Sequence, residues 1–498
     1  MQLKLVDTLV AHDLDGWIVC VYEDETVTTI RELLANSGVP DATGAEALVA
    51  VVSDAVSSKE FVGKPGTTWM LRPLGVLPTA RVALVGLGKR AEAASWRVAR
   101  GVALGARSLR TSGARRIGIA SFDCDRAAVS DGVVSGLYDF LKYRTPTEEP
   151  PTVEEVFIEG SQELLDDVRR GEVVAEAVNF CRNVNNEPPG VATPSFVATV
   201  AMQLADESTT VAVLDEVALA ERGMNAILSV GQGSASPPRI VTVHYRGAAD
   251  DVPVYALVGK GVTFDSGGLS IKPAASMEEM KFDKSGACVV LGVMKAVRDL
   301  RLPLNVVGVL GLAENMPDGS AYRPGDIVRA GNGKTIEVLN TDAEGRVVLA
   351  DALYHAGGFK PVAMLDFATL TGAIVVALGD LCAGVMGTDE PLINELLEAS
   401  KRSGERIWQL PLWPEYDEKV KSDVADIKNI GERSGGMGMA GAIAGASFLK
   451  AFVPEGCRWA HLDIAAVANG KKRAWHAAGA TAFGVRLAVE WLRSRIKG

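Results

Sequence analysis

The sequence predicts an α/β protein in which a small N-terminal α/β domain precedes a larger C-terminal α/β/α domain with a mostly parallel central sheet. Three observations lead to this fold class. Apolar runs of strand length alternate with helical patterns. A proline-rich segment divides the chain near residue 150. Carboxylates follow the ends of predicted strands, where open α/β sheets bind ligands.

The N-terminal domain is expected over residues 1–160, and a linking helix is expected over residues 161–185. Residues 144–152 read Arg-Thr-Pro-Thr-Glu-Glu-Pro-Pro-Thr, which predicts a surface linker or long loop. A last strand follows this loop. The apolar runs of strand length lie at 16–21, 47–52, 81–85 and 153–158, and the helical patterns at 91–109 and 129–141.

The C-terminal domain is expected over residues 186–498. Its predicted strands are β-branched or apolar runs, and helical patterns follow several of them. Strands that alternate with helices predict a mostly parallel sheet covered on both faces. The strands are predicted at 252–258, 304–312, 335–339, 361–367 and 459–464, and the helices at 286–300, 347–356 and 440–452.

Composition and charge exclude several classes of protein. The chain has 498 residues, 51 basic and 62 acidic, and its net charge of −11 argues against a nucleic-acid binder that relies on overall positive charge. The N-terminus lacks the apolar core of a secretory signal, and the most apolar stretch, 367–379, is too short to cross a bilayer. Six cysteines without a CxxC pair fit a reducing cytoplasm. We therefore expect a cytoplasmic protein that uses neither a membrane nor a nucleic acid as its partner.

Common hydrolase and nucleotide motifs are also missing. The five histidines include no HExxH pair, and no serine occupies a GxSxG elbow. The segment Val85-Gly-Leu-Gly-Lys89 follows a strand but completes neither GxGxxG nor GxxxxGK[ST]. Helix-borne zinc peptidases and serine hydrolases with the usual elbow are thereby excluded.

Carboxylates gather instead in two glycine-rich segments near strand ends, one over 258–287 and one over 340–346. They are Asp265, Asp283, Asp342 and Glu344. Buried carboxylates are costly unless they are paired or bound to cations. Four of them with few basic partners suit divalent ions, and sharing them between two ions is the two-metal arrangement.

Structural explanations exist for each of these elements. Thr341 and Glu344 stand before a helical run with the spacing of a capping box. Asp283 could cap the helix that begins near Gly286, and Lys260 and Lys272 could be solvated surface residues. The joint occurrence of these residues at the ends of adjacent strands favours a functional site.

The segments Lys260-Gly-Val-Thr-Phe-Asp-Ser-Gly-Gly268 and Asn340-Thr-Asp-Ala-Glu-Gly-Arg346 resemble the signatures of the leucyl aminopeptidase (cytosol aminopeptidase) family. The resemblance covers about residues 180–498, whereas the first 150 residues match only in size and α/β character. Further similar segments lie at 231–234, 314–317, 323–326, 368–373 and 459–464.

The resemblance implies a metal-dependent aminopeptidase that removes the N-terminal residue from peptides with a free N-terminus, with leucine and other apolar residues preferred. Its cofactors would be two divalent ions, Mn²⁺ or Zn²⁺, that activate a water, together with bicarbonate, and its assembly a homohexamer. The implied metal ligands are Lys260, Asp265, Asp283, Asp342 and Glu344, with Asp265 and Glu344 bridging. The implied catalytic side chains are Lys272 and Arg346, with bicarbonate held by Arg346 and the backbone near Leu370, and the implied substrate-pocket residues are Met280, Thr369 and Gly372.

One residue departs from the family pattern. Lys284, directly after Asp283, stands where the pattern commonly has methionine. A cation there could weaken metal binding, form a salt bridge at the rim of the site, or reshape the substrate pocket. The departure concerns side-chain preference more than the reaction.

Two rival hypotheses remain. A two-metal phosphoesterase would also need clustered carboxylates, but a lysine ligand and the lack of nearby histidines argue against it. A non-catalytic scaffold or nucleic-acid binder is disfavoured because Lys272 and Arg346 are intact and the isoelectric point is about 5.2.

Overall fold

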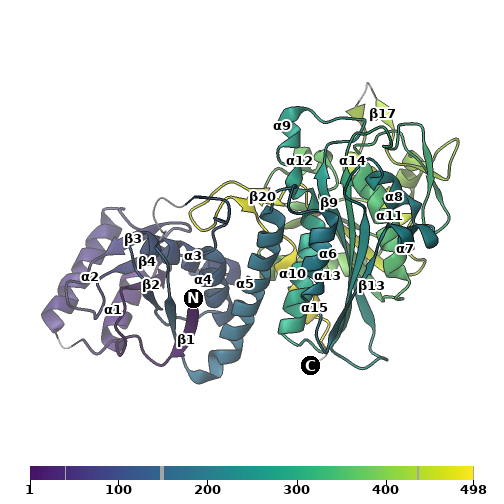
Figure 1. Cartoon of the computed structure of the whole chain (residues 1–498). Helices are drawn as coiled ribbons and strands as arrows, with labels where there is room; N and C mark the ends of the chain where they lie inside the picture. Colours follow the sequence, from purple (N-terminus) through teal and green to yellow (C-terminus); the bar gives the residue numbers. More distant parts are fainter. Residues whose placement is uncertain (40, 146–150, 435–436, 497–498) are drawn as a thin grey trace. The chain divides into compact units, whose positions relative to one another are not determined.

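The computed structural model describes residues 1–39, 41–145, 151–434 and 437–496, and it divides into two compact units (Figure 1). Unit 1 contains Met1–Glu176 and Lys471–Ala478, and unit 2 contains Ala177–Gly470 and Gly479–Gly498. The boundary between them falls inside helix α5 (Leu165–Asn186). The linker predicted over 144–152 falls largely on residues 146–150, which lie outside the described residues.

Unit 1 is built on a six-stranded sheet in the order β1-β6-β5-β2-β4-β3, parallel except for the pairing of β3 with β4. Successive residues of β2 point to opposite faces. Ile18 packs among α3 and α4, and Trp17 packs among α1 and α2. The strands are β1 (Gln2–Val6), β2 (Gly16–Val21), β3 (Thr68–Leu71), β4 (Val82–Gly86), β5 (Arg116–Ile119) and β6 (Glu155–Glu159), and the helices are α1 (Thr26–Asn36), α2 (Ala42–Ser57), α3 (Ser95–Thr111) and α4 (Arg126–Gly136).

The strand expected at 47–52 is wrong, because this run lies inside α2. The buried residues of α2 are Leu48, Val49, Val52 and Ala55, which recur on one face of a helix. The other positions of the run 47–52 are also alanine or valine, so the helical period is hidden in a continuous apolar run.

Unit 2 is built on an eight-stranded sheet in the order β15-β14-β19-β13-β9-β10-β8-β7. The four central strands, β19, β13, β9 and β10, are parallel, which confirms the expected central sheet. The antiparallel pairings lie outside them, where β14 joins β19, β8 joins β10 and β7 joins β8. The strands are β7 (Thr209–Leu214), β8 (Arg239–Arg246), β9 (Val254–Asp265), β10 (Asn305–Asn315), β13 (Ala363–Ala368), β14 (Ala383–Gly387), β15 (Ile407–Gln409) and β19 (Arg458–Asp463).

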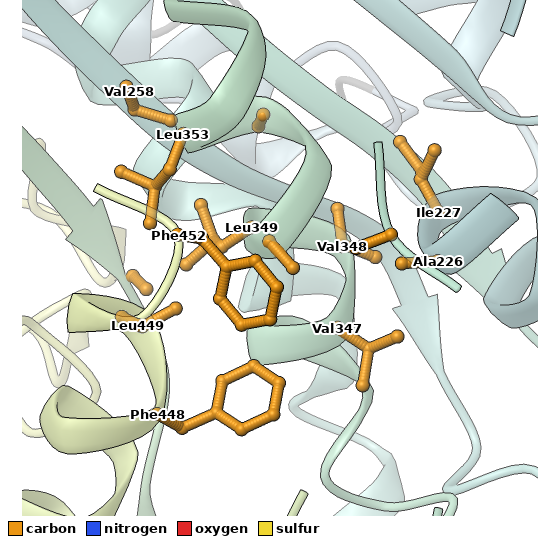
Figure 2. Packing of buried hydrophobic residues seen from close by; sticks show 14 of the residues in the cluster. Ala226, Ile227, Val258, Val347, Val348, Leu349, Leu353, Phe448, Leu449 and Phe452 are labelled. Carbon is orange, nitrogen blue, oxygen red and sulfur yellow. The ribbon is translucent and has the colours of Figure 1, made fainter. Parts of the chain in front are cut away.

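Helices cover both faces of this sheet and make three layers (Figure 1). Helices α10 (Ser285–Asp299), α13 (Glu390–Ser403) and α15 (Val485–Arg493) lie on one face, and α8 (Asn225–Gly231), α11 (Glu344–Gly357) and α14 (Gly441–Lys450) lie on the other. In Figure 2, Leu349 and Leu353 of α11 pack against Phe448 of α14 and Val258 of β9, all fully buried. This core holds the N-terminus of α11 against the sheet.

The central parallel strands end at one edge of the sheet, and each ends in a polar residue or is followed directly by one. Strand β9 ends at Asp265, β10 at Asn315 and β19 at Asp463, and Thr369 directly follows β13. A register shift between β9 and β10 aligns Asp265 with Asn315. The topology therefore gathers these side chains at the carboxyl edge of the sheet.

No helix in the described part of the chain is both long enough and apolar enough to cross a membrane.

Candidate metal centre

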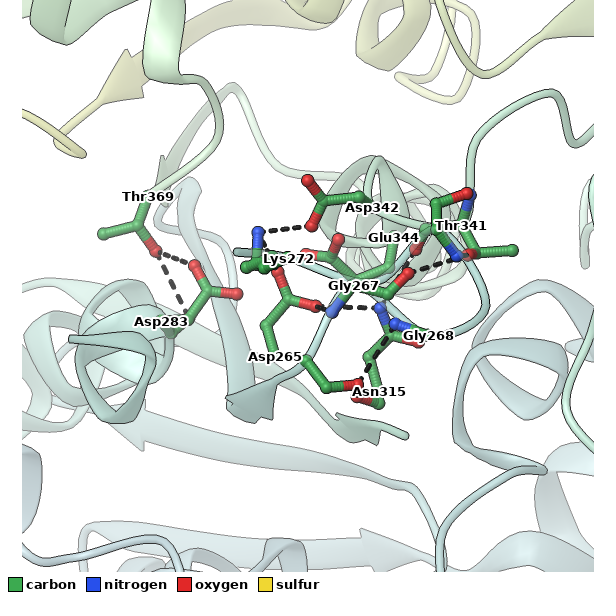
Figure 3. A network of polar contacts seen from close by, with 12 residues as sticks. Asp265, Gly267, Gly268, Lys272, Asp283, Asn315, Thr341, Asp342, Glu344 and Thr369 are labelled. Atoms are coloured by element: carbon green, nitrogen blue, oxygen red, sulfur yellow. Dashed lines mark hydrogen bonds and ion pairs between the residues drawn. The ribbon is translucent and has the colours of Figure 1, made fainter. Parts of the chain in front are cut away.

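Four predicted carboxylates converge at the carboxyl edge of the unit 2 sheet (Figure 3). Asp265 ends β9, Asp283 lies in the 3₁₀ helix η3 (Met280–Lys284), and Asp342 and Glu344 stand at the start of α11. Asp265, Asp342 and Glu344 each offer an oxygen, and these oxygens lie within 4.8 Å of one another. Asp265, Asp283 and Glu344 are at most 5% exposed.

Lys260 lies in the middle of this cluster, and 3% of its surface is exposed. Its Nζ is 2.8 Å from Asp283 Oδ1 and 2.9 Å from Glu344 Oε1, and it donates to the carbonyl of Thr369 at 2.8 Å. Burial opposes its charge, but Asp283 and Glu344 outweigh burial and raise the pKa of Lys260. Gly345 makes this approach possible, because a Cβ there would lie 2.3 Å from Lys260 Cε.

Lys272 reaches the opposite side of the carboxylates. Its Nζ lies 2.8 Å from Asp265 Oδ2 and also contacts Asp342. A tight loop brings it back to Asp265, and Gly267 adopts a left-handed φ of +87° within that loop. A Cβ at Gly267 would lie 2.5 Å from the carbonyl of Ser270, so only glycine fits.

The structural caps considered for Thr341 and Asp283 are wrong. Helix α11 has Ala343 at its N-cap, and α10 has Lys284, in both cases without a side-chain cap. The hydroxyl of Thr341 instead donates to the carbonyl of Gly267 at 2.7 Å. Thr341 thereby ties the start of α11 to the loop that carries Lys272.

Asn315 is a site residue whose role the sequence did not reveal. Its Nδ2 donates to Asp265 Oδ1 at 2.8 Å and to the carbonyl of Thr341 at 2.9 Å. It therefore orients a carboxylate of the cluster and fixes the loop before α11. Its position at a strand end, inside the family-like segment 314–317, is the signal that could have identified it.

Arg346 lies in the first turn of α11 and is 7% exposed. Its Nε has no hydrogen-bond partner among the described residues. Burial lowers the pKa of Arg346, although Glu344 and Asp463 oppose that shift. A Cβ at Gly445 would lie 3.6 Å from Arg346 Nη2 and 2.9 Å from Leu370 Cδ2, so the guanidinium and Leu370 border the same glycine.

The three expected pocket residues lie on segments that border the cluster. Met280 begins η3, and the hydroxyl of Thr369 donates to Asp283 Oδ1 at 2.7 Å. Gly372 begins α12 (Gly372–Leu378) and faces open space, because no atom lies within 4 Å of a Cβ built there.

Lys284 is fully buried, so its ammonium does not form a salt bridge at the exposed rim of the site, as was considered from the sequence. It donates to the main-chain carbonyls of Glu187 and Lys281, at 3.0 and 2.6 Å. Burial lowers the pKa of Lys284 to about 8.

The chemistry of this donor set fits divalent cations. Burial, with Glu344 and Asp283 adding to it, raises the pKa of Asp265, which reflects the crowding of negative charge. Oδ2 of Asp283 is buried and has no hydrogen-bond partner among the described residues. Clustered carboxylate oxygens are ligands suited to hard or borderline divalent ions.

Two sequence models of the cytosol aminopeptidase family match the chain. The catalytic-domain model matches residues 179–489, and the N-terminal-domain model matches residues 18–147. A probable cytosol aminopeptidase of Geobacter sp. (strain M21) is 42% identical over 501 residues, covering 98% of this chain and 99% of the relative. A second, from Syntrophotalea carbinolica, is 44% identical and covers 96% of each chain.

Solved structures agree over nearly the whole chain. A mutant of tomato leucine aminopeptidase superposes with a TM-score of 0.86 at 32% identity, covering 99% of this chain and 97% of the other. The bottromycin maturation enzyme BotP in complex with Mn superposes with a TM-score of 0.81 at 35% identity, covering 96% of this chain and 99% of the other.

Proposed function

The chain belongs to the cytosol aminopeptidase family and is a metallo-exopeptidase of the hydrolase class, and we propose that it prefers leucine and other apolar residues at the N-terminus of its peptide substrates. The observation that supports a metal-dependent reaction is the carboxylate cluster, in which Asp283 has a buried oxygen without a hydrogen-bond partner among the described residues. Lys272 lies beside this cluster with its ammonium on Asp265.

Divalent metal use follows from the family and from the Mn-bound neighbour, and we assign two ions, Mn²⁺ or Zn²⁺, to the site. Asp265, Asp283, Asp342 and Glu344 would hold them, together with Lys260 in its neutral amine form, because metal ligands must be deprotonated. When bound, two such ions lower the pKa of a common water and supply hydroxide near neutral pH.

Lys272 would stabilise the negative charge that develops on the scissile carbonyl oxygen. Although burial opposes it, Asp265 and the neighbouring acids raise the pKa of Lys272, which favours its charged form. The loop through Gly267 holds this charge beside the carboxylates.

Arg346 would hold a bicarbonate ion together with the main chain near Leu370. A planar guanidinium suits a planar oxyanion that accepts two hydrogen bonds. The unpartnered Nε of a buried Arg346 supports this assignment. Bicarbonate in this position would act as the general base.

We assign the first side chain of the substrate to a pocket bordered by Met280, Thr369 and Gly372. The hydroxyl of Thr369 contacts Asp283. Gly372 lies three residues further along the chain, and the space where its Cβ would be is open. An apolar wall next to an acidic cluster favours leucine or methionine over aspartate.

Metal removal tests the proposal. Protein stripped by a chelator should lose leucyl-anilide hydrolysis, and Mn²⁺, Zn²⁺, Co²⁺ or Mg²⁺ supplied in turn should restore it to different extents. Asp342→Ala and Glu344→Ala should each lose activity and at least one metal per subunit by elemental analysis. Full activity of protein shown to be metal-free would contradict the two-metal assignment. Turnover of a chromogenic phosphate ester with leucyl anilide untouched would favour the phosphoesterase instead.

We also propose that the chain assembles as a homohexamer and works in the cytoplasm, as the family resemblance implies. Light scattering of the purified protein would test the assembly. A stable monomer at working concentration would contradict it.

A further inference from the structure

We propose that Asp463 is a positioning residue that holds the loop 369–371 against the metal centre. The inference rests on the proposed function, because it assigns a role to a residue behind the proposed ligands. Among the described residues, the buried carboxylate of Asp463 forms its hydrogen bonds with the loop that contacts the assigned ligands and not with the ligands themselves.

Asp463 ends β19 and is fully buried. Its Oδ2 accepts a hydrogen bond from the hydroxyl of Thr371 at 2.6 Å. Its Oδ1 accepts from the main-chain N–H of Leu370 at 3.1 Å and from that of Ala465 at 3.3 Å. One side chain thus binds two consecutive residues of the loop that follows β13.

The preceding residue of the same loop binds two proposed metal ligands. The hydroxyl of Thr369 donates to Asp283 Oδ1 at 2.7 Å (Figure 3). The carbonyl of Thr369 accepts from Lys260 Nζ at 2.8 Å. A shift of the loop would therefore displace the partners of Asp283 and Lys260, whereas Asp342 is contacted by Lys272.

The position requires a carboxylate and not merely a polar residue. The oxygen of Thr371 already accepts from the N–H of Ile374 at 3.2 Å, as the N-cap of α12. Its hydroxyl proton must therefore go to an acceptor, which Asp463 Oδ2 provides. The carbonyl oxygen of an asparagine could keep the bonds from the N–H groups of Leu370 and Ala465. Its NH₂ group would then face the hydroxyl of Thr371, so two donors would meet without an acceptor between them. Asparagine should therefore rescue the site only in part.

The experiment compares Asp463→Ala and Asp463→Asn in the full-length protein with Asp351→Ala and Asp351→Asn as matched controls. Asp351 is also fully buried, and its carboxylate accepts main-chain N–H bonds from Ile227 at 2.9 Å and Gly331 at 2.7 Å. It controls for the loss of a buried carboxylate elsewhere in unit 2.

Metal affinity is measured by competition with a chromophoric chelator, and kcat and KM with leucyl anilide at saturating Mn²⁺. Residues behind metal ligands typically contribute about 10- to 100-fold to metal affinity or activity. We expect Asp463→Ala to weaken one of the two metals and to lower kcat by about that factor, with little change in KM. The metal affinity and kcat of Asp463→Asn should lie between those of Asp463→Ala and the wild type. The Asp351 variants should leave metal affinity and kcat near wild type.

Asp463→Ala that is folded by circular dichroism and keeps wild-type metal affinity and kcat would overturn the positioning role. Equal losses in the Asp463 and Asp351 variants would overturn it too. If Asp463→Ala does not fold, Thr371→Val should lower metal affinity and Thr371→Ser should restore it. A wild type that binds no metal pair or cleaves no leucyl anilide would instead overturn the proposed function.

Discussion

The ammonium of Lys284 donates a hydrogen bond to the main-chain carbonyl of Glu187, with 3.0 Å between nitrogen and oxygen. A second bond goes to the carbonyl of Lys281, and the side chain is fully buried. The side chain of the neighbouring Ser285 accepts a bond from Asn185 at 2.8 Å. Lys284 and Ser285 thus attach η3, which carries Asp283, to the residues at the end of α5.

Lys284→Met should leave substrate preference unchanged, because the ammonium is engaged by main-chain carbonyls. We expect the ratio of kcat/KM for leucyl and phenylalanyl anilides to stay within about twofold of wild type, which is about 0.4 kcal/mol because about 1.4 kcal/mol corresponds to a factor of ten. Met280→Ala, at an assigned pocket wall, should change that ratio. A similar change in both variants would show that Lys284 also borders the pocket.

Lys272→Ala and Lys260→Ala should separate catalysis from metal binding. Loss of one donor to a developing oxyanion usually costs about 10²–10³ in kcat, so Lys272→Ala should lose that factor and keep both metals. Lys260→Ala should bind one metal more weakly, because Lys260 Nζ lies among the carboxylates. Elemental analysis and kinetics on the same preparations test this. Loss of a metal in Lys272→Ala but not in Lys260→Ala would reverse the two roles.

N-acetylated peptides should not be cleaved. Acetylation turns the terminal amine into a planar amide without a basic lone pair, which can neither bind a cation nor carry charge beside the carboxylates. Hydrolysis of leucyl and acetyl-leucyl anilides, followed side by side, measures the difference. Comparable turnover of the two would rule out recognition of the free amine.

Activity should rise when bicarbonate is added to protein prepared in carbonate-free buffer. Arg346 offers a buried guanidinium whose Nε is unpartnered among the described residues. Arg346→Ala should therefore be less active and should no longer respond to bicarbonate. Arg346→Lys keeps the charge but loses the planar fork, so it should respond weakly. An equal bicarbonate response in wild type and Arg346→Ala would contradict the assignment.

Stability should depend on pH in opposite directions through two residues of α11. Burial lowers the pKa of His355 to about 4 and raises that of Asp351 to about 6. Between about pH 6.5 and 4, His355 is protonated in the unfolded chain but not in the folded chain. Stability is therefore lost as pH falls through this window. Between about pH 4 and 6, Asp351 is protonated in the folded chain but not in the unfolded chain. Stability is therefore lost as pH rises through this window.

Each group changes the free energy of unfolding by about 3 kcal/mol over its pH window. When one group is removed, the pH dependence that the other causes should become visible. Relative to wild type, His355→Gln should gain unfolding temperature as pH is lowered from 6.5 to 4, and Asp351→Asn should gain it as pH is raised from 4 to 6. Unfolding curves at closely spaced pH values measure both. Parallel pH profiles for wild type and both variants would contradict the assigned shifts.

The sequence by itself determined the central architecture and the chemistry of the site. Strands β9, β10, β13 and β19 are rich in β-branched and apolar residues because both faces of these strands are covered. Glycine is needed at 267, where the backbone turns back within a few residues. These features depend on neighbours along the chain, and the carboxylates stand out because they end apolar segments.

Only the tertiary structure decided which partner each polar group meets. The run 47–52 is helical because its buried face packs against the unit 1 sheet, which its local composition does not specify. Asn315, Thr341 and Lys284 bind groups that lie far away in the sequence. Asp463 accepts a hydrogen bond from the main-chain N–H of Leu370, which lies 93 residues away in the sequence. A buried polar group takes whichever donor or acceptor the packed strands and helices bring within about 3 Å, and that choice is made only when they pack.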